Sequence, residues 1–282
     1  MTDAPQRLAD LSVLVFVVSS MLALGMSQRL ADVAAPLRRP RAIVLALAVN
    51  FVLSPLLALG LIKIIPLQPA HATGLLLLST AAGAPFLPKL AEICGGNLAY
   101  SVALMLLLMG ASTLFMPSIL PLIAPGLQAD PWTVARPLLV FMLLPLGVGF
   151  ALALGAAGAS WLERLLVFVR RLSNLALVLL VVLFIGLNLK TLLGTFGSFA
   201  IATYALYLFA VMAAAYLLGA ADAPTRNVFA LAAGCRNLAA ALVIARANSD
   251  DPAVTVMLIV AFAVSLVVLL GFARAVRPTV RQ

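Results

Sequence analysis

The sequence predicts an all-α membrane protein with nine transmembrane helices. Hydrophobic residues make up 65% of the 282 positions and charged residues only 10%, whereas a soluble domain carries about a quarter charged residues. Nine segments are long and apolar enough to cross the hydrocarbon core of a bilayer, which takes about 20 residues. Two of the nine are interrupted by residues that break helices. Together these observations predict a polytopic protein with irregular backbone inside the membrane.

The nine segments follow one another with short connections. They run over residues 9–30, 41–65, 70–94, 97–123, 132–157, 170–190, 197–219, 225–247 and 252–275. The connections carry turn signals such as Pro66-Leu67-Gln68-Pro69. Between the fifth and sixth segments, residues 161–169 are expected to form a short helix lying in the membrane interface. No connection is long enough for a soluble domain, so we expect one transmembrane domain over 1–282.

Arginines gather in the connections that fall on one side of a nine-span topology. The group comprises Arg29, Arg38, Arg39, Arg41, Arg164, Arg170, Arg171, Arg226, Arg274, Arg277 and Arg281. Basic residues mark the cytoplasmic side, which predicts an outside N-terminus and a cytoplasmic C-terminus. The net charge of +9 therefore indicates a lipid bilayer, not nucleic acid, as the partner. Short loops and an Ala/Arg/Leu-rich composition favour a bacterial inner membrane.

The interruptions lie in the third and eighth segments. The third contains two prolines, Pro85 and Pro88, which remove backbone donors and break a helix. The eighth contains Gly234, Arg236 and Asn237, where lipid would favour leucine. Such backbone is tolerated at membrane depth only where it is buried in protein or lines a cavity.

The two interruptions occupy matching positions. Each lies in the third segment of a set of four, and one segment separates the sets. An odd span between two equal units inverts the second unit, which is the layout of an inverted-repeat secondary transporter. We therefore expect two broken helices that cross near the midplane, with the substrate site where they meet.

The sequence gives little support for an enzyme or for a metal site. The chain has one histidine, His71, and two cysteines, Cys94 and Cys235. These form neither a disulfide framework nor a metal-ligand cluster. Intramembrane enzymes need paired aspartates, a Ser–His pair or a metal cluster, so we predict no enzyme, no metal and no cofactor.

Several motifs resemble those of the bile acid:sodium symporter family. Asn50-Phe51-Val52-Leu53-Ser54-Pro55, residues 95–104 and residues 234–242 are similar to three of its motifs, in the same order. The resemblance covers Leu22 to about Val268. It implies a core domain, about 70–123 and 225–275, and a panel domain, about 9–65 and 132–219.

The positions equivalent to that family's sodium ligands have mostly lost their oxygens. The set comprises Asn50, Leu87, Pro88, Ser101, Met105, Ala232, Ala233 and Cys235. Only Asn50 and Ser101 keep a side-chain oxygen, whereas a hard cation needs several oxygen ligands. The resemblance alone would make sodium a possible coupling ion. We predict instead that the usual coupling to two sodium ions is absent.

We predict a substrate site formed by Arg236, Asn237, Lys89 and Pro85. An ionised arginine at the centre of a transmembrane helix costs at least about 2.5 kcal/mol and defaults to a functional role. The start of a half-helix also disfavours a cation, so Arg236 should meet an anion or replace a lost sodium ion. A structural alternative is that Arg236 caps carbonyls freed by the break. Lys89 either carries charge for transport or pairs with Glu92, three residues on.

The predicted function is secondary transport of a small organic anion, bile acid-like or a carboxylate, by alternating access. Two other functions stay open. One is export of a metalloid through the thiol of Cys94 or Cys235, and the other is a transport-inactive sensor on the same scaffold. The oligomeric state does not follow from the sequence.

Overall fold

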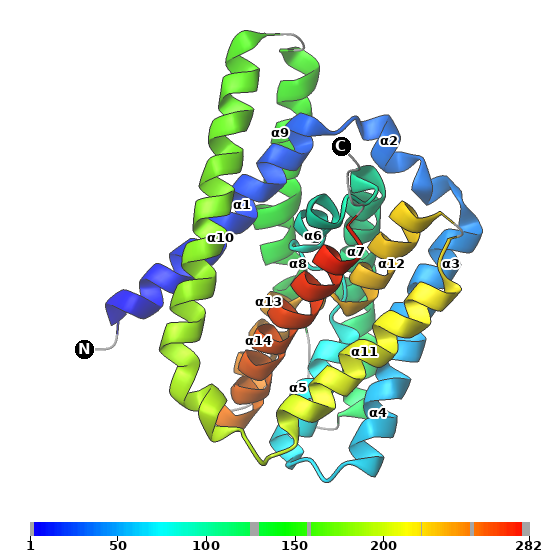
Figure 1. Cartoon of the computed structure of the whole chain (residues 1–282), viewed down its shortest axis with the longest axis vertical. Helices are drawn as coiled ribbons and strands as arrows, with labels where there is room; N and C mark the ends of the chain where they lie inside the picture. Colours follow the sequence, from blue (N-terminus) through cyan, green and yellow to red (C-terminus); the bar gives the residue numbers. More distant parts are fainter. Residues whose placement is uncertain (1–2, 125–129, 157–158, 221, 249–250, 278–282) are drawn as a thin grey trace. The chain divides into compact units, whose positions relative to one another are not determined.

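The computed structural model describes residues 3–124, 130–156, 159–220, 222–248 and 251–277. Within these ranges the chain is helical, without a β-strand, and contains one isolated antiparallel bridge between Ala82 and Arg236. This confirms the all-α class. Figure 1 shows the helices in chain order.

The described helices are α1 (Asp3–Ser27), α2 (Leu30–Ala34), η1 (Pro36–Arg38), α3 (Pro40–Ala48), η2 (Val49–Leu53), α4 (Ser54–Ile64), α5 (Pro69–Thr80), α6 (Leu87–Cys94), α7 (Leu98–Ile123), α8 (Pro131–Leu138), η3 (Leu139–Leu143), α9 (Leu144–Gly155), α10 (Ser160–Gly194), α11 (Ala200–Leu218), α12 (Ala223–Gly234), α13 (Leu238–Asn248) and α14 (Pro252–Ala275). The short helix η1 is a 3-10 helix, while η2 and η3 are π-helical turns within longer helices.

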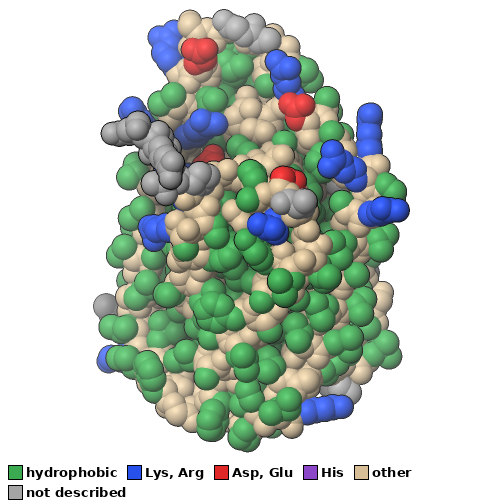
Figure 2. Space-filling model, turned by 45° about the vertical axis from the view of Figure 1, so that its right-hand side comes forward, with side chains coloured by type: hydrophobic (Ala, Val, Ile, Leu, Met, Phe, Trp, Pro, Cys, Tyr) green, Lys and Arg blue, Asp and Glu red, His purple; other side chains and the backbone are tan. Residues whose placement is uncertain are grey.

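Seven helices among the described residues are long and apolar enough to cross a membrane. They are Arg7–Ser27, Pro40–Ile64, Leu98–Ile123, Ala135–Gly155, Ser160–Gly194, Ala200–Leu218 and Pro252–Ala275. Hydrophobic side chains cover much of the face in Figure 2, as lipid contact requires. The third and eighth predicted segments instead fold as pairs of half-helices, α5 with α6 and α12 with α13. The total of nine spans stays a prediction.

Helix α10 corrects one expectation. Residues 161–169 do not form a separate interfacial helix, because α10 runs without interruption from Ser160 to Gly194 over 35 residues. A helix of this length spans roughly 50 Å, well beyond a hydrocarbon core of about 30 Å. Its charged first turns can therefore lie outside the core while the same helix crosses the bilayer.

By contacts, the chain divides into two compact units. Unit 1 comprises Met1–Val33 and Arg136–Thr191. Its helices α1 and α9 pack closely, because a Cβ on Gly25 would overlap the carbonyl oxygen of Leu146 and one on Gly149 would overlap that of Leu22. Small residues that allow such close approach are the usual basis of helix association in membranes.

Unit 2 comprises Ala34–Ala135 and Leu192–Gln282 and contains both broken helices. Helix α5 packs against α14, where a Cβ on Gly74 would lie 2.6 Å from Met257 Cβ. Helix α11 packs against α12 and places the fully buried rings of Tyr204 and Tyr207 in the interior of the unit. Residues 34–65 and 192–219 thus group by contacts with the broken helices, while the predicted panel and core domains stay a prediction.

Candidate substrate site at the crossing of two broken helices

The two broken helices cross within unit 2. The first break, residues 81–86, separates α5 from α6, and the second break, residues 235–237, separates α12 from α13. Ala82 and Arg236 form an antiparallel bridge, and the Asn237 N–H donates a hydrogen bond of 2.8 Å to the Ala81 carbonyl. The breaks therefore satisfy part of each other's backbone, as burial at membrane depth demands.

The first break is anchored to α7. The hydroxyl of Ser112 accepts a hydrogen bond of 2.9 Å from the Ala82 N–H and donates one of 3.0 Å to the Ala82 carbonyl. Gly83 has a φ of 82° and lies against the backbone of Met109, which leaves no room for a Cβ. Pro85 is half-buried within the break, and Pro88 is buried in the first turn of α6.

Arg236 is buried at the second break, with 6% of its surface exposed. Its guanidinium donates from Nη1 to the Ser79 carbonyl at 3.4 Å and from Nη2 to the Ala233 carbonyl. These carbonyls lie in the last turns of α5 and α12, where the helix dipole favours a cation. Arg236 precedes the start of α13 as expected, but its guanidinium reaches two helix C-terminal ends, so it does cap carbonyls at the break, as the structural alternative predicted.

Aromatic and hydroxyl groups surround the same guanidinium. Its Cζ lies 5.8 Å from the centre of the Tyr207 ring, within range of a cation–π interaction. The hydroxyls of Tyr207 and Ser54 are 2.6 Å apart, and the Ser54 hydroxyl donates to the Ser79 carbonyl at 2.8 Å. Ser79, Ser54, Tyr207 and Arg236 thus form one connected polar cluster, which we call the arginine cluster.

The positive charge of the arginine cluster lies in the interior of the unit. Within the described part of the chain, no carboxylate pairs with Arg236, and its buried Nε has no hydrogen-bond partner. A buried charge is costly unless an opposite charge compensates it. The cluster is therefore complementary to an anion, which guanidinium groups bind through charge-assisted hydrogen bonds.

Asn237 has a structural position beside this cluster. Its side chain is 1% exposed, and its Oδ1 accepts a hydrogen bond of 3.1 Å from the Ala240 N–H, which caps α13. Its Nδ2 lies 3.5 Å from the Gly83 carbonyl of the first break. The amide therefore joins the breaks and orders the start of α13, whereas its predicted contact with substrate stays untested.

Lys89 lies in a local ion pair on α6. Its Nζ forms an ion pair of 2.8 Å with Glu92, and their side chains are 26% and 35% exposed. The structure thus forms the local pair that the three-residue spacing predicts. No contact joins Lys89 to the arginine cluster among the described residues.

The positions equivalent to sodium ligands supply few free oxygens. Six of these positions are buried and have no side-chain oxygen, namely Leu87, Pro88, Met105, Ala232, Ala233 and Cys235. The Ser101 hydroxyl donates to the Leu98 carbonyl at 2.6 Å. Asn50 is fully buried in the π-helical turn η2, where its Nδ2 donates to the Ala46 carbonyl at 3.0 Å. Its Oδ1 accepts no hydrogen bond from any residue that the structure describes.

Sequence reasoning missed Ser54, Ser79, Tyr207 and Ser112, which hold the crossing together. Ser54 lies four residues after Asn50, so a polar face on that helix was detectable. The others are single polar residues within apolar helices, and only their long-range partners distinguish them.

The two cysteines lie in the interior of the protein. Cys94 and Cys235 are both buried and reduced. Among the described residues, no group of three His, Cys, Asp or Glu side chains is arranged to hold a metal ion.

Comparison with known protein families bears on the identity of this chain. The family model for the sodium bile acid symporter family matches residues 13–195, which is well over half of the chain and includes the first break. No curated protein matches the chain. Members of this family are membrane transporters, and the resemblance found in the motifs is thereby confirmed. The chain belongs to the sodium bile acid symporter family.

Proposed function

We propose that this protein is a secondary transporter of a small organic anion, bile acid-like or a simple carboxylate, that works by alternating access. The observation that carries the proposal is the buried guanidinium of Arg236, which lies between two half-helices without a carboxylate partner in the described chain. Its unpartnered Nε is a donor for a substrate oxygen. An anion bound there would compensate the charge.

The same guanidinium supports transport without the usual coupling to two sodium ions. It already donates hydrogen bonds to the Ser79 and Ala233 carbonyls, whose oxygens could otherwise coordinate a cation. Apart from these, Asn50 and Ser101 supply the side-chain oxygens of the equivalent positions, and the Ser101 hydroxyl lies against its own helix. Sodium needs several oxygen ligands, so we infer that Arg236 acts as a fixed cation in place of a bound ion.

The test is counterflow of radiolabelled anions in proteoliposomes. The anions are taurocholate and a panel of small carboxylates, each measured in sodium and in potassium. The expected result is uptake of at least one anion at equal rates in both salts. Arg236→Ala should abolish uptake, and Arg236→Lys should retain part of it. Arg246→Ala is the matched control, because Arg246 is an exposed cation in the last turn of α13.

Other outcomes separate the alternatives. Uptake that requires sodium would contradict the uncoupled mechanism while keeping the transporter. Binding of an anion in a thermal-shift assay, without counterflow, would favour a sensor. A metalloid exporter would confer arsenite resistance that Cys94→Ser or Cys235→Ser abolishes, and it would leave anion uptake absent in the wild type.

A further inference from the structure

The arginine cluster takes one residue from each of four segments that the predicted inverted repeat relates in pairs. Ser54 and Tyr207 lie in the second segment of each set of four, and Ser79 and Arg236 lie in the third. In the predicted division, the first pair belongs to the panel domain and the second pair to the core domain. The cluster therefore joins the parts of unit 2 that alternating access would move against each other.

Two contacts cross from one pair to the other. The Ser54 hydroxyl donates to the Ser79 carbonyl at 2.8 Å, and the Arg236 Cζ lies 5.8 Å from the centre of the Tyr207 ring. The guanidinium also donates to the Ser79 and Ala233 carbonyls, which belong to the two broken helices. One positive charge thus contacts both broken helices and the aromatic ring on α11.

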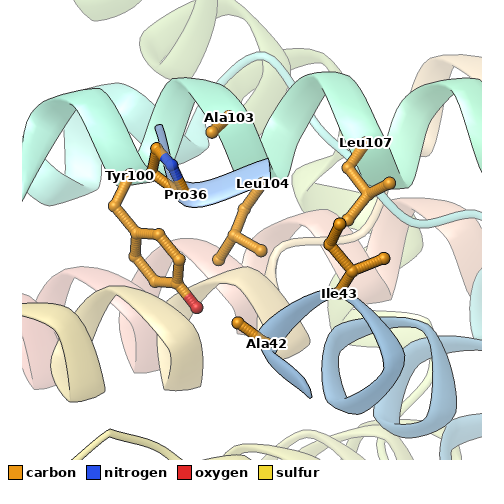
Figure 3. A pocket seen from close by; sticks show the side chains of 7 residues that line it. All are labelled: Pro36, Ala42, Ile43, Tyr100, Ala103, Leu104 and Leu107. Atoms are coloured by element: carbon orange, nitrogen blue, oxygen red, sulfur yellow. The ribbon is translucent and has the colours of Figure 1, made fainter. Parts of the chain in front are cut away.

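Another part of the predicted boundary between panel and core is apolar. Figure 3 shows the chain from η1 into α3 against the first turns of α7, where Ile43, Leu104 and Leu107 line a small hollow. Apolar burial is non-directional, so this contact does not depend on whether a substrate is bound. A movement that depends on substrate is expected at the arginine cluster, whose contacts depend on a charge.

The charge of the cluster without a ligand follows from its neighbours. The guanidinium acts electrostatically on Tyr204, Tyr207 and Cys235, and hydroxyl and thiol groups are uncharged at neutral pH. No carboxylate pairs with Arg236 among the residues that the structure describes. By these residues, the site carries one positive charge when it is empty.

This charge makes movement of the empty site costly. Alternating access takes the site through an occluded state, which is closed to both sides of the membrane. A buried charge without an opposite charge is unfavourable there, so the barrier is high for the empty site. An anion with one negative charge cancels the charge of the guanidinium, whereas an anion with two charges leaves one in excess.

We propose that the protein is an obligatory exchanger of singly charged organic anions. This inference rests on the proposed transport function. The site passes through the occluded state with one anion bound to Arg236, and it returns with a second anion from the other side. Without an anion, the guanidinium stays on the Ser79 and Ala233 carbonyls and against the Tyr207 ring, and the core does not move past the panel. One anion replaces another in each cycle, so no co-transported ion is required.

Efflux from proteoliposomes of the full-length protein tests this proposal. The vesicles are loaded with radiolabelled taurocholate, or with a labelled monocarboxylate that shows counterflow. Efflux is measured into buffer with the same unlabelled anion and into buffer without it, with equal potassium on both sides and valinomycin to prevent a build-up of charge. Exchange should be at least about tenfold faster than net efflux, because the barrier from one uncompensated buried charge exceeds the amount that changes a rate tenfold.

The outcomes separate the exchange mode from transport itself. Net efflux as fast as exchange would overturn obligatory exchange and leave the proposed transporter intact. Absence of both fluxes for every anion would refute transport as well. A dicarboxylate outside should support exchange at least about tenfold more slowly than the monocarboxylate of the same chain length, and equal rates would overturn the restriction to single charges.

A carboxylate placed beside Arg236 provides a sharper test. The Ser54 hydroxyl and the guanidinium donate to the same Ser79 oxygen, so Ser54→Asp would supply an internal counter-ion, which the neighbouring guanidinium keeps ionised. The empty site would then be neutral and the loaded site negative. Net efflux should become at least as fast as exchange, which reverses the order of the wild type.

Ser54→Asn is the matched variant, because it has the size of Ser54→Asp without the charge. It should keep exchange faster than net efflux, even if both rates fall. Arg246→Ala, at an exposed position of α13, should keep both rates close to those of the wild type. A reversal of the order in both Ser54 variants would show that charge is not the cause and would overturn the proposal. The wild-type measurements decide it even if a buried substitution at position 54 unfolds the protein.

Discussion

The first and second breaks meet at one crossing in unit 2, yet they are built from different residues. The first break spans six residues, contains Pro85 and a glycine at a φ of 82°, and has no charged side chain. The second break spans three residues, contains no proline, and places Arg236 and Asn237 between its half-helices. The first break is formed by residues that restrict or permit unusual backbone angles, whereas the second is formed around two polar side chains.

The difference shows a division of roles. The first break and the end of α5 supply carbonyl acceptors, at Ser79, Ala81 and Gly83. The second break supplies the donors that reach them, from Arg236 and Asn237. Because buried backbone groups must be paired, each break depends on the other, and substitutions in the two breaks should differ in kind as well as in size.

The largest effect is expected at Gly83. In Gly83→Ala, the Cβ would meet the backbone of Met109 at a φ that disfavours any other residue. Strain and overpacking together should lower the free energy of unfolding by about 4 kcal/mol. Unfolding in sodium dodecyl sulfate measures this. Gly110→Ala, in open space on α7, is the control and should be neutral or slightly stabilising. Equal free energies of unfolding for both variants would refute the close approach of Gly83 to the Met109 backbone.

The second largest loss of stability is expected for Ser112→Ala. It leaves both the N–H and the carbonyl of Ala82 without the hydroxyl that they bind, which should cost about 2 kcal/mol. Ser118→Ala on the same helix removes a hydroxyl that bonds only to the Leu114 carbonyl at an exposed position. The same unfolding assay should show little change for Ser118→Ala, and a similar loss in both variants would mean that α7 does not anchor the first break.

Asn237→Ala should have a smaller effect, close to 1.5 kcal/mol, because it removes the cap of α13 and the contact with Gly83. Asn97 caps α7 in the same way, accepting from the Tyr100 N–H at 2.9 Å, but at an exposed position. Asn97→Ala should therefore cost less, near 1 kcal/mol or below. If Asn97→Ala lowered the free energy of unfolding more than Asn237→Ala, the hydrogen bond from Asn237 to Gly83 would contribute nothing to stability.

The smallest effect is expected at Lys89. Its pair with Glu92 is partly exposed and local, and such pairs contribute less than about 0.5 kcal/mol. Lys89→Gln should leave stability and anion uptake close to wild type, in contrast to Arg236→Ala. Loss of uptake in proteoliposomes would instead place Lys89 in the transport cycle.

Local sequence determined much of the architecture. Apolar length predicts the spans because the bilayer sets a minimum helix length, and proline and glycine predict the first break because they act on their own backbone. The ion pair of Lys89 with Glu92 follows from helical spacing alone. Residues 161–169 show the limit of such reasoning, because charged residues without a helix breaker did not end α10.

Only the tertiary structure decided how the buried charge is held. Arg236 is identifiable in the sequence as a cation inside a membrane segment, but its acceptor at Ser79 lies 157 positions away. Ser54 and Tyr207, which complete the cluster, are 153 positions apart. Periodicity and propensity report on neighbours within a few residues. The partners of a buried polar group are set by which helices cross, and that depends on the packing of the whole unit.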